Sequence, residues 1–129
     1  MTSVYVPYRA ASYLAPTGNA HHLFAVMNDP CAQHQCLVIN VTSIKEGRAH
    51  DSACELNPGD HPFIVHPSYV LYRMAETLHK ARIGRYIDSG YYLSRNDWQP
   101  DVFARIAAGI YTSDETILRI VRYAKENGI

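Results

Sequence analysis

HLFAVMNDPCAQHQCLVINVT, residues 22–42, predicts the centre of the β structure. It contains two apolar runs, residues 22–27 and residues 36–42, separated by an Asn-Asp-Pro turn at residues 28–30. Apolar runs of this length between turns favour buried strands, and the second run is rich in β-branched residues. Because the connection is short, we predict that the two strands pair as an antiparallel hairpin.

The segments around this hairpin predict further short strands. A turn is expected at residues 16–19, where proline and glycine occur together, and another at residues 57–60. Three more segments are β-prone: 4–6, 53–56 and 68–72. The first ends at a proline, the second at a turn, and the third where the spacing of apolar residues changes from that of a strand to that of a helix. About five short strands from one region are enough to curl into a barrel, which buries their apolar faces and removes exposed edges. We therefore expect residues 1–74 to form mainly a small curled antiparallel β-barrel.

From about Ala75 onward the apolar residues follow the spacing of helices. A first helix is expected to end at Gly90, and a second to begin at Pro100, which suits the first turn of a helix. The sequence TSDE at residues 112–115 fits a capping box and predicts the start of a third helix. About three C-terminal helices would then make residues 75–129 mainly a helical tail, and residues 1–129 a single α+β domain.

Composition limits the classes of function. The 12 basic and 12 acidic side chains cancel, so no global field attracts the protein to nucleic acid or to an anionic membrane. No stretch approaches the roughly 20 apolar residues that span a bilayer, so we expect no membrane association. Three cysteines are an odd number and too few for a disulfide scaffold. We therefore expect a cytoplasmic protein.

Histidines provide the strongest chemical signal. Six of the seven fall within one 46-residue stretch that also holds all three cysteines: His21, His22, His34, His50, His61 and His66. Imidazole can act as a general acid, a general base or a metal ligand near neutral pH. A histidine in a turn can also simply hydrogen-bond the backbone, and we slightly favour that structural role for His61, which lies between a turn and Pro62.

Metal and cofactor sites receive little support from the sequence. The spacing of Cys31, His34 and Cys36 is a poor match to zinc sites, which prefer paired knuckles such as C-x2-C. The phosphate-binding glycine motifs of nucleotide enzymes do not occur in the sequence. We expect neither a metal ion nor a cofactor.

Residues 22–29, 37–43 and 56–64 resemble a group of small uncharacterised bacterial proteins, which look like distant relatives of the PemK/MazF toxins. The likeness to the uncharacterised group extends into residues 104–109, whereas the likeness to the toxins covers mainly the two central strands. In the toxins the first strand follows an arginine-proline pair and the second ends in a threonine-serine pair. Thr42-Ser43 match the second element, but His21-His22 stand where the first would be.

The resemblance implies an SH3-like barrel and a metal-independent endoribonuclease of a toxin-antitoxin system, which cleaves single-stranded RNA through attack by the RNA's own 2′-OH. His22 would then be the base, Thr42 or Ser43 would orient the phosphate, and Arg73 or His61 would assist because the toxin arginine is missing. Three further residues are candidates for RNA binding: His21, His66 and Tyr69.

A second class of function is compatible with the same residues. A barrel that has lost its chemistry would be a non-catalytic protein-protein interaction module, which binds an antitoxin-like chain or another copy of itself as a homodimer. The missing arginine and the neutral net charge favour this alternative. Both hypotheses require the two hydrophobic runs to lie side by side, so that the Thr42 loop approaches His21-His22.

Overall fold

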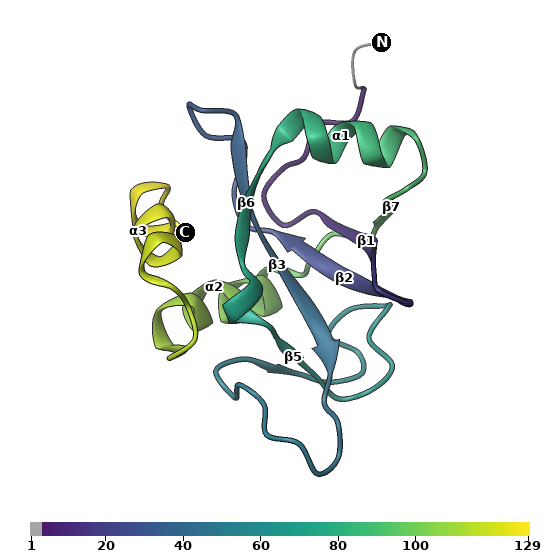
Figure 1. Cartoon of the computed structure of the whole chain (residues 1–129), viewed down its shortest axis with the longest axis vertical. Helices are drawn as coiled ribbons and strands as arrows, with labels where there is room; N and C mark the ends of the chain where they lie inside the picture. The colour runs from purple at the N-terminus through teal and green to yellow at the C-terminus, as the bar shows by residue number, and fades with distance from the viewer. Residues whose placement is uncertain (1–3) are drawn as a thin grey trace.

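The structure, a computed structural model, describes residues 4–129. It is an α+β domain with a seven-stranded antiparallel sheet, three α-helices and a short 3-10 helix, η1 (Figure 1). The strands are β1 (Ser12–Thr17), β2 (Ala20–Val26), β3 (Gln35–Ser43), β4 (Glu55–Leu56), β5 (Ser68–Val70), β6 (Glu76–His79) and β7 (Leu93–Arg95). The helices are η1 (Tyr72–Met74), α1 (Lys80–Asp88), α2 (Pro100–Thr112) and α3 (Leu118–Glu126). The α+β class expected from the sequence is confirmed.

Strand β3 is the centre of the sheet. One edge pairs with β2 in an antiparallel register that places Leu23 opposite Val41, which confirms the predicted hairpin. The other edge pairs with β6 along the first half of β3 and with β5 at its end. The strand order β4-β5-β3-β2-β1-β7 ends in two edge strands, with no pairing between them among residues 4–129. The sheet is therefore open, and the closed barrel expected from the sequence is not confirmed.

Strand β3 is buried on both faces. Leu37 and Ile39 face the larger hydrophobic cluster, which also contains the buried side chains of α2 and α3. Cys36 and Val38 face a smaller cluster that includes Ile83 of α1. Because both faces are covered, the sequence of the strand is a continuous apolar run rather than an alternation of polar and apolar residues.

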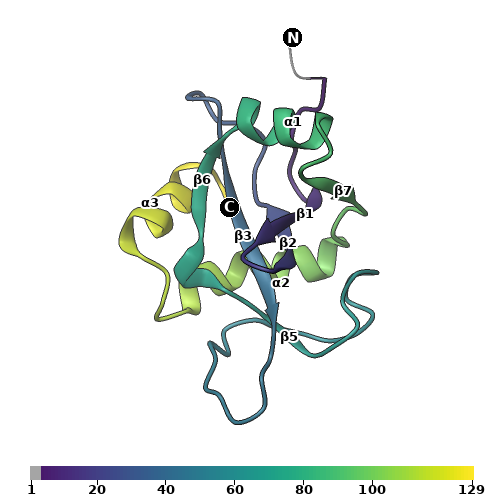
Figure 2. The ribbon, with the colours of Figure 1, turned by 45° about the vertical axis from the view of Figure 1, so that its right-hand side comes forward.

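Helix α2 crosses one face of the sheet (Figure 2) and packs closely on Tyr72. Its apolar stripe, which includes Val102 and Ile106, was predicted from the spacing and is buried. The Tyr72 hydroxyl donates a hydrogen bond of 2.7 Å to the Ile106 carbonyl. Gly109 lies beside the same ring and leaves no room there for a larger residue. Tyr72 therefore links the segment after β5 to the helical layer.

Several local predictions are wrong. Residues 4–6 form no strand; instead, the backbone N–H groups of Val4 and Tyr5 donate to the Asp88 carboxylate. Strands β1 and β7 were not anticipated, and residues 76–79 form strand β6 rather than the first turn of a helix. The C-terminal part of the chain therefore contributes two strands to the sheet as well as helices.

The prediction that residues 112–115 form a capping box at the start of the third helix is also wrong. Helix α2 continues through Thr112, and α3 begins only at Leu118. The Ser113 hydroxyl donates to the Asp51 carboxylate and accepts a hydrogen bond from the Glu115 N–H. Ser113 therefore stabilises the turn between the helices, and Thr112, the predicted cap of the third helix, is instead the last residue of α2. None of the helices within residues 4–129 is long and apolar enough to cross a bilayer.

Candidate functional site

A cleft of about 430 Å³ opens at the end of the β2-β3 hairpin. One wall comes from the start of β2 and the end of β3, and the other from residues 62–66, which precede β5. Polar side chains, including His22 and Thr42, lie on the strand side, whereas Phe63 and Val65 make the opposite wall apolar. The cleft therefore combines groups that can exchange protons with an apolar surface.

His22 and Thr42 lie side by side on the strand wall of this cleft. The β2-β3 register pairs Leu23 with Val41, so the next pair outward, His22 and Thr42, lies on the same face of the sheet. The distance from His22 Nε2 to Thr42 Oγ1 is 3.5 Å, and the Thr17 hydroxyl of β1 contacts His22 Nδ1. The predicted approach of the Thr42 loop to His21-His22 is confirmed.

The electrostatic surroundings of His22 suit a proton acceptor. Burial and then the nearby Lys45 ammonium lower the pKa of His22 below its usual 6.5. At neutral pH the imidazole is therefore mostly uncharged and able to accept a proton. Lys45 itself lines the cleft and has no ion-pair partner among the side chains of residues 4–129. Its ammonium is available to a bound anion.

Lys45 was not predicted from the sequence to be a site residue. A signal was present, because Lys45 follows the predicted Thr42-Ser43 pair closely and is one of the few basic residues in the first half of the chain. A charged residue in a loop has no spacing pattern, however, and only the fold shows that the loop turns back toward His22.

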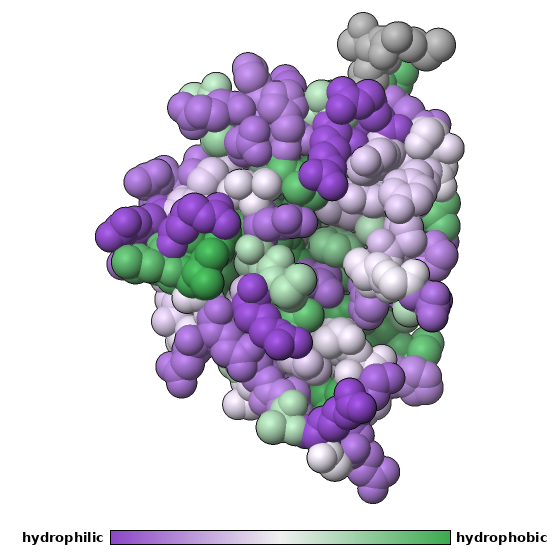
Figure 3. Space-filling view, in the orientation of Figure 1, coloured by the Kyte–Doolittle hydropathy of each residue, from purple (hydrophilic) through white to green (hydrophobic). Residues whose placement is uncertain are grey.

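A second hollow of about 290 Å³ adjoins the cleft. It shares Thr42, Ser43 and Lys45 with the cleft and adds Arg48, Tyr69 and Arg73 among its lining residues. Figure 3 shows strongly hydrophilic residues gathered at the bottom of the view, over the loop that follows β3. Two residues predicted from the sequence, Tyr69 and Arg73, thus lie beside the cleft rather than in it.

The other predicted site residues fall into two groups. His21 and His66 are exposed and line the cleft, as does Ser43. His61 is not among the residues that line it; it borders a separate hollow together with Asn96. The structure therefore gathers His21, His22, Thr42, Ser43 and His66 around one cleft and leaves His61 outside it.

His61 is held in place by both ring nitrogens. Its Nε2 lies 2.9 Å from the Asn96 carbonyl and 3.0 Å from the Ser12 hydroxyl, and its Nδ1 accepts the Phe63 N–H. The ring is buried against Trp98, with ring centroids 4.6 Å apart, and burial lowers its pKa. This geometry matches the structural role considered for His61 and provides no support for its candidate catalytic role.

The cysteine-histidine segment does not form a metal site. Cys36 is fully buried in the smaller hydrophobic cluster, whereas the Cys31 thiol lies near Gln33. No group of three or more His, Cys, Asp or Glu side chains within the described range, residues 4–129, is arranged to hold a metal ion.

Comparison with solved structures identifies similar folds. An endoribonuclease in complex with its cognate antitoxin, from a mycobacterial species, matches with a TM-score of 0.55 and 15% sequence identity over 84% of this chain and 93% of that chain. A chain from a MazE-MazF crystal structure from Deinococcus radiodurans matches with a TM-score of 0.54 and 15% identity over 84% and 94%. No protein-family model and no curated protein matches the sequence. These similarities establish a MazF-like fold.

Proposed function

We propose that this protein is a toxin-like endoribonuclease, which cleaves single-stranded RNA in the His22 cleft without a metal ion. The observation that carries the proposal is a largely uncharged imidazole 3.5 Å from the Thr42 hydroxyl, in a cleft that also contains the Lys45 ammonium. The MazF-like fold supports the same conclusion, because the similar solved structures include an endoribonuclease. In this proposal the open sheet is a variant of the SH3-like barrel. The protein would act in the bacterial cytoplasm.

The proposed reaction begins with proton transfer to His22. Nε2 accepts the proton of a ribose 2′-OH while the Thr17 hydroxyl at Nδ1 holds the ring in orientation. The 2′ oxygen attacks the adjacent phosphorus, and the bond from phosphorus to the 5′ oxygen of the next nucleotide breaks. The products are a 2′,3′-cyclic phosphate and a 5′-OH, whose proton comes from the imidazolium or from water.

Negative charge gathers on the non-bridging phosphate oxygens as the 2′ oxygen attacks. The hydroxyls of Thr42 and Ser43 can donate hydrogen bonds to these oxygens, and Lys45 supplies a positive charge in the same cleft. In this proposal Lys45 stabilises the negative charge that an arginine stabilises in the toxins. Arg73 lies in the adjoining hollow. Side chains of this chain thus provide both proton transfer and charge stabilisation.

The test is an RNA cleavage assay in the presence of EDTA. We expect purified protein to cleave a labelled single-stranded RNA and to leave a cyclic phosphate, which mass spectrometry detects. His22→Ala is expected to lower kcat by about 100-fold or more, since a positioned general base contributes about that much. Intact RNA after incubation with the folded protein, or equal cleavage by His22→Ala, would refute the proposal.

His34→Asn is the matched control for that assay. His34 is exposed just before the start of β3, about 25 Å along the strand from the cleft. Its φ of 63° lies in the left-handed region, which asparagine tolerates well. The substitution therefore removes an imidazole without straining the backbone, and we expect cleavage to be retained.

The second candidate function is a non-catalytic interaction module that binds an antitoxin-like protein. The apolar wall of the cleft favours it, because Phe63 and Val65 are 42% and 67% exposed. The two solved structures named above are an endoribonuclease in complex with its cognate antitoxin and MazE-MazF. Co-purification of one stoichiometric protein without RNA cleavage would favour this function over the nuclease.

A homodimer is also proposed, and sedimentation of the purified protein tests it.

A further inference from the structure

Side chains from four strands form a row on the sheet face that carries His22. His22 of β2 contacts Thr42 of β3, Thr42 is opposite Tyr69 of β5, and Tyr69 is opposite Glu55 of β4. Neighbouring strands lie about 4.8 Å apart, so two strand spacings place Tyr69 roughly 10 Å from His22. The row therefore runs outward from the proposed base, His22, past Thr42 to Tyr69 and Glu55.

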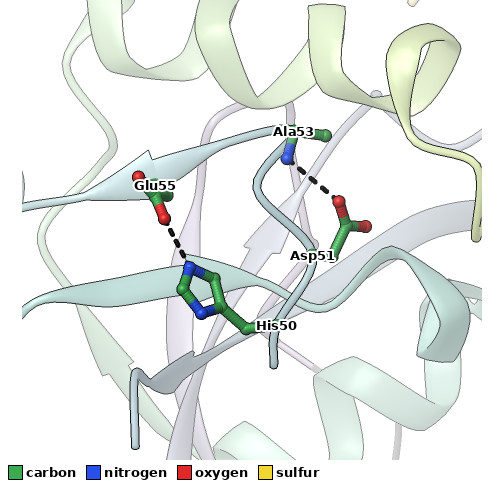
Figure 4. Close-up of polar contacts among 4 residues, drawn as sticks. All are labelled: His50, Asp51, Ala53 and Glu55. Carbon is green, nitrogen blue, oxygen red and sulfur yellow. Dashed lines mark hydrogen bonds and ion pairs between the residues drawn. The ribbon is translucent and has the colours of Figure 1, made fainter. Parts of the chain in front are cut away.

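The Tyr69 ring is held in position by His50. The ring centroids of Tyr69 and His50 are 5.1 Å apart, at an angle of 41°. His50 Nε2 is in turn bonded to the Glu55 carboxylate, as Figure 4 shows. Tyr69 is partly buried, so one part of the ring packs against protein while another part remains accessible in the hollow. These contacts prepare an aromatic surface for stacking.

Positive charge dominates this hollow. Lys45, Arg48 and Arg73 line it, and none of the three forms an ion pair with a carboxylate in residues 4–129. Of the three carboxylates in residues 46–55, Glu55 is bonded to His50, and Asp51 accepts hydrogen bonds from the Ala53 N–H (Figure 4) and from the Ser113 hydroxyl. The third, Glu46, is exposed and is not among the residues that line the hollow. The hollow is therefore suited to an anion with a planar group attached.

We infer that this hollow is a nucleotide subsite, which binds the residue next to the scissile one on the same RNA strand. The base stacks on Tyr69, and its phosphate is bound by Arg48 and Arg73. Thr42, Ser43 and Lys45 border both the cleft and the hollow, so the strand passes from one to the other over the end of β3. The inference rests on the proposed function for the cleavage step, but it predicts RNA binding independently of cleavage.

The first experiment measures how cleavage depends on substrate length. Oligonucleotides with one ribonucleotide among deoxynucleotides are extended one residue at a time on either side of the scissile position. We expect kcat/KM to rise about tenfold or more for one added residue on one side only, because stacking of a base on an aromatic side chain contributes about that much. Tyr69→Leu should reduce this step by about tenfold, whereas Tyr69→Phe should preserve it.

The second experiment measures binding without cleavage. The probe is a labelled single-stranded RNA with a 2′-O-methyl group at every position, which cannot react. Arg48→Ala with Arg73→Ala should weaken binding and reduce the slope of log K against log salt by about 0.7 for each phosphate that is no longer neutralised. Arg119→Ala, which removes an exposed arginine of α3, is the matched control and should change neither value.

The two experiments distinguish the inference from the proposed function. If the protein does not cleave RNA but the double arginine variant binds more weakly and with less salt dependence, the subsite stands and the nuclease proposal fails. If the protein cleaves RNA but neither the length step nor the binding changes in the Tyr69→Leu and arginine variants, the subsite is refuted. The arginine side chains are exposed, so their removal tests the inference even if Tyr69→Leu destabilises the sheet.

Discussion

Replacement of Gly109 by alanine is expected to destabilise the protein, although alanine is the better helix former. A methyl group at Gly109 would overlap the hydroxyl oxygen of Tyr72 and lie 2.5 Å from the ring carbon that carries it. Both approaches are far closer than van der Waals contact, and Tyr72 is buried and cannot swing into solvent. The substitution must therefore displace the Tyr72 ring or the helix.

The expected magnitude follows from three contributions. Overpacking of a buried side chain costs about 1–3 kcal/mol. Loss of the 2.7 Å hydrogen bond from Tyr72 to the Ile106 carbonyl leaves a buried hydroxyl unsatisfied, which costs about 1–3 kcal/mol. The change from glycine to alanine inside a helix returns about 1 kcal/mol. We expect the free energy of unfolding to fall by about 3 kcal/mol.

Urea denaturation followed by the fluorescence of Trp98 measures this change. Trp98 is the only tryptophan and is 3% exposed, so its emission reports the loss of the core. Ala108→Gly, on the exposed side of the same helix, is the control for helix propensity and should cost only about 1 kcal/mol. An unchanged or increased stability of Gly109→Ala would refute the packing of α2 on Tyr72.

The pKa values of buried and exposed groups lead to three further predictions. Lys45→Met should raise the pKa of His22 toward 6.5, because a positive charge is removed. The acidic limb of the profile of kcat/KM against pH should therefore move to higher pH, and a shift to lower pH would contradict the role of His22 as the base. The free energy of unfolding should decrease as pH falls below about 6.5, because the unfolded chain protonates His61 more readily than the folded protein does. Urea titrations at several pH values measure this, and the free energy of unfolding of His61→Asn should depend less on pH than that of the unsubstituted protein. Iodoacetamide should modify Cys31, whose pKa is lowered, well before Cys36, whose pKa burial raises to about 12, and mass spectrometry of the native protein would reveal the opposite order.

The central hairpin was predictable because its sequence agrees with its environment at every level. Residues 22–27 and 36–42 are mainly apolar and bounded by turns, and their apolar side chains are buried in the two hydrophobic clusters. The helix that begins at Pro100 was predictable for a similar reason, since its apolar stripe matches the face it buries. In these elements local preference and tertiary contact favour the same structure.

The missed strands depend on partners distant in the sequence. Residues 76–79, ETLH, have no strong strand preference, and they become β6 because β3 offers an open edge beside them. Strand β1 contains Pro16 and is partnered by β2 and β7. The box at residues 112–115 failed for the same reason, because the distant Asp51 binds Ser113. Pairing over long distances in the chain overrode local preference in each case.

The candidate site was predictable where it depended on register and not where it depended on loops. Once β2 and β3 are paired, His22 must face Thr42, and a slip of one residue would bring His21 there instead. Lys45 and Arg48 lie in a loop, whose course no sequence pattern specifies. His61 illustrates the opposite limit, because its sequence surroundings permitted catalysis but its three hydrogen-bonding contacts fix it in the core.

The neutral net charge, which by itself favours an interaction module, does not describe the surface around the end of β3. Lys45, Arg48 and Arg73 gather there around one hollow, whereas Glu55 is bonded to His50, Asp51 is bonded to Ala53 and Ser113, and Glu46 does not line the hollow. A protein with this distribution has no long-range field to attract RNA, but it has a concentrated local one. Recognition must then depend on contacts made after encounter, so discrimination between RNA strands would come from stacking and phosphate position in the two hollows rather than from electrostatic attraction at a distance.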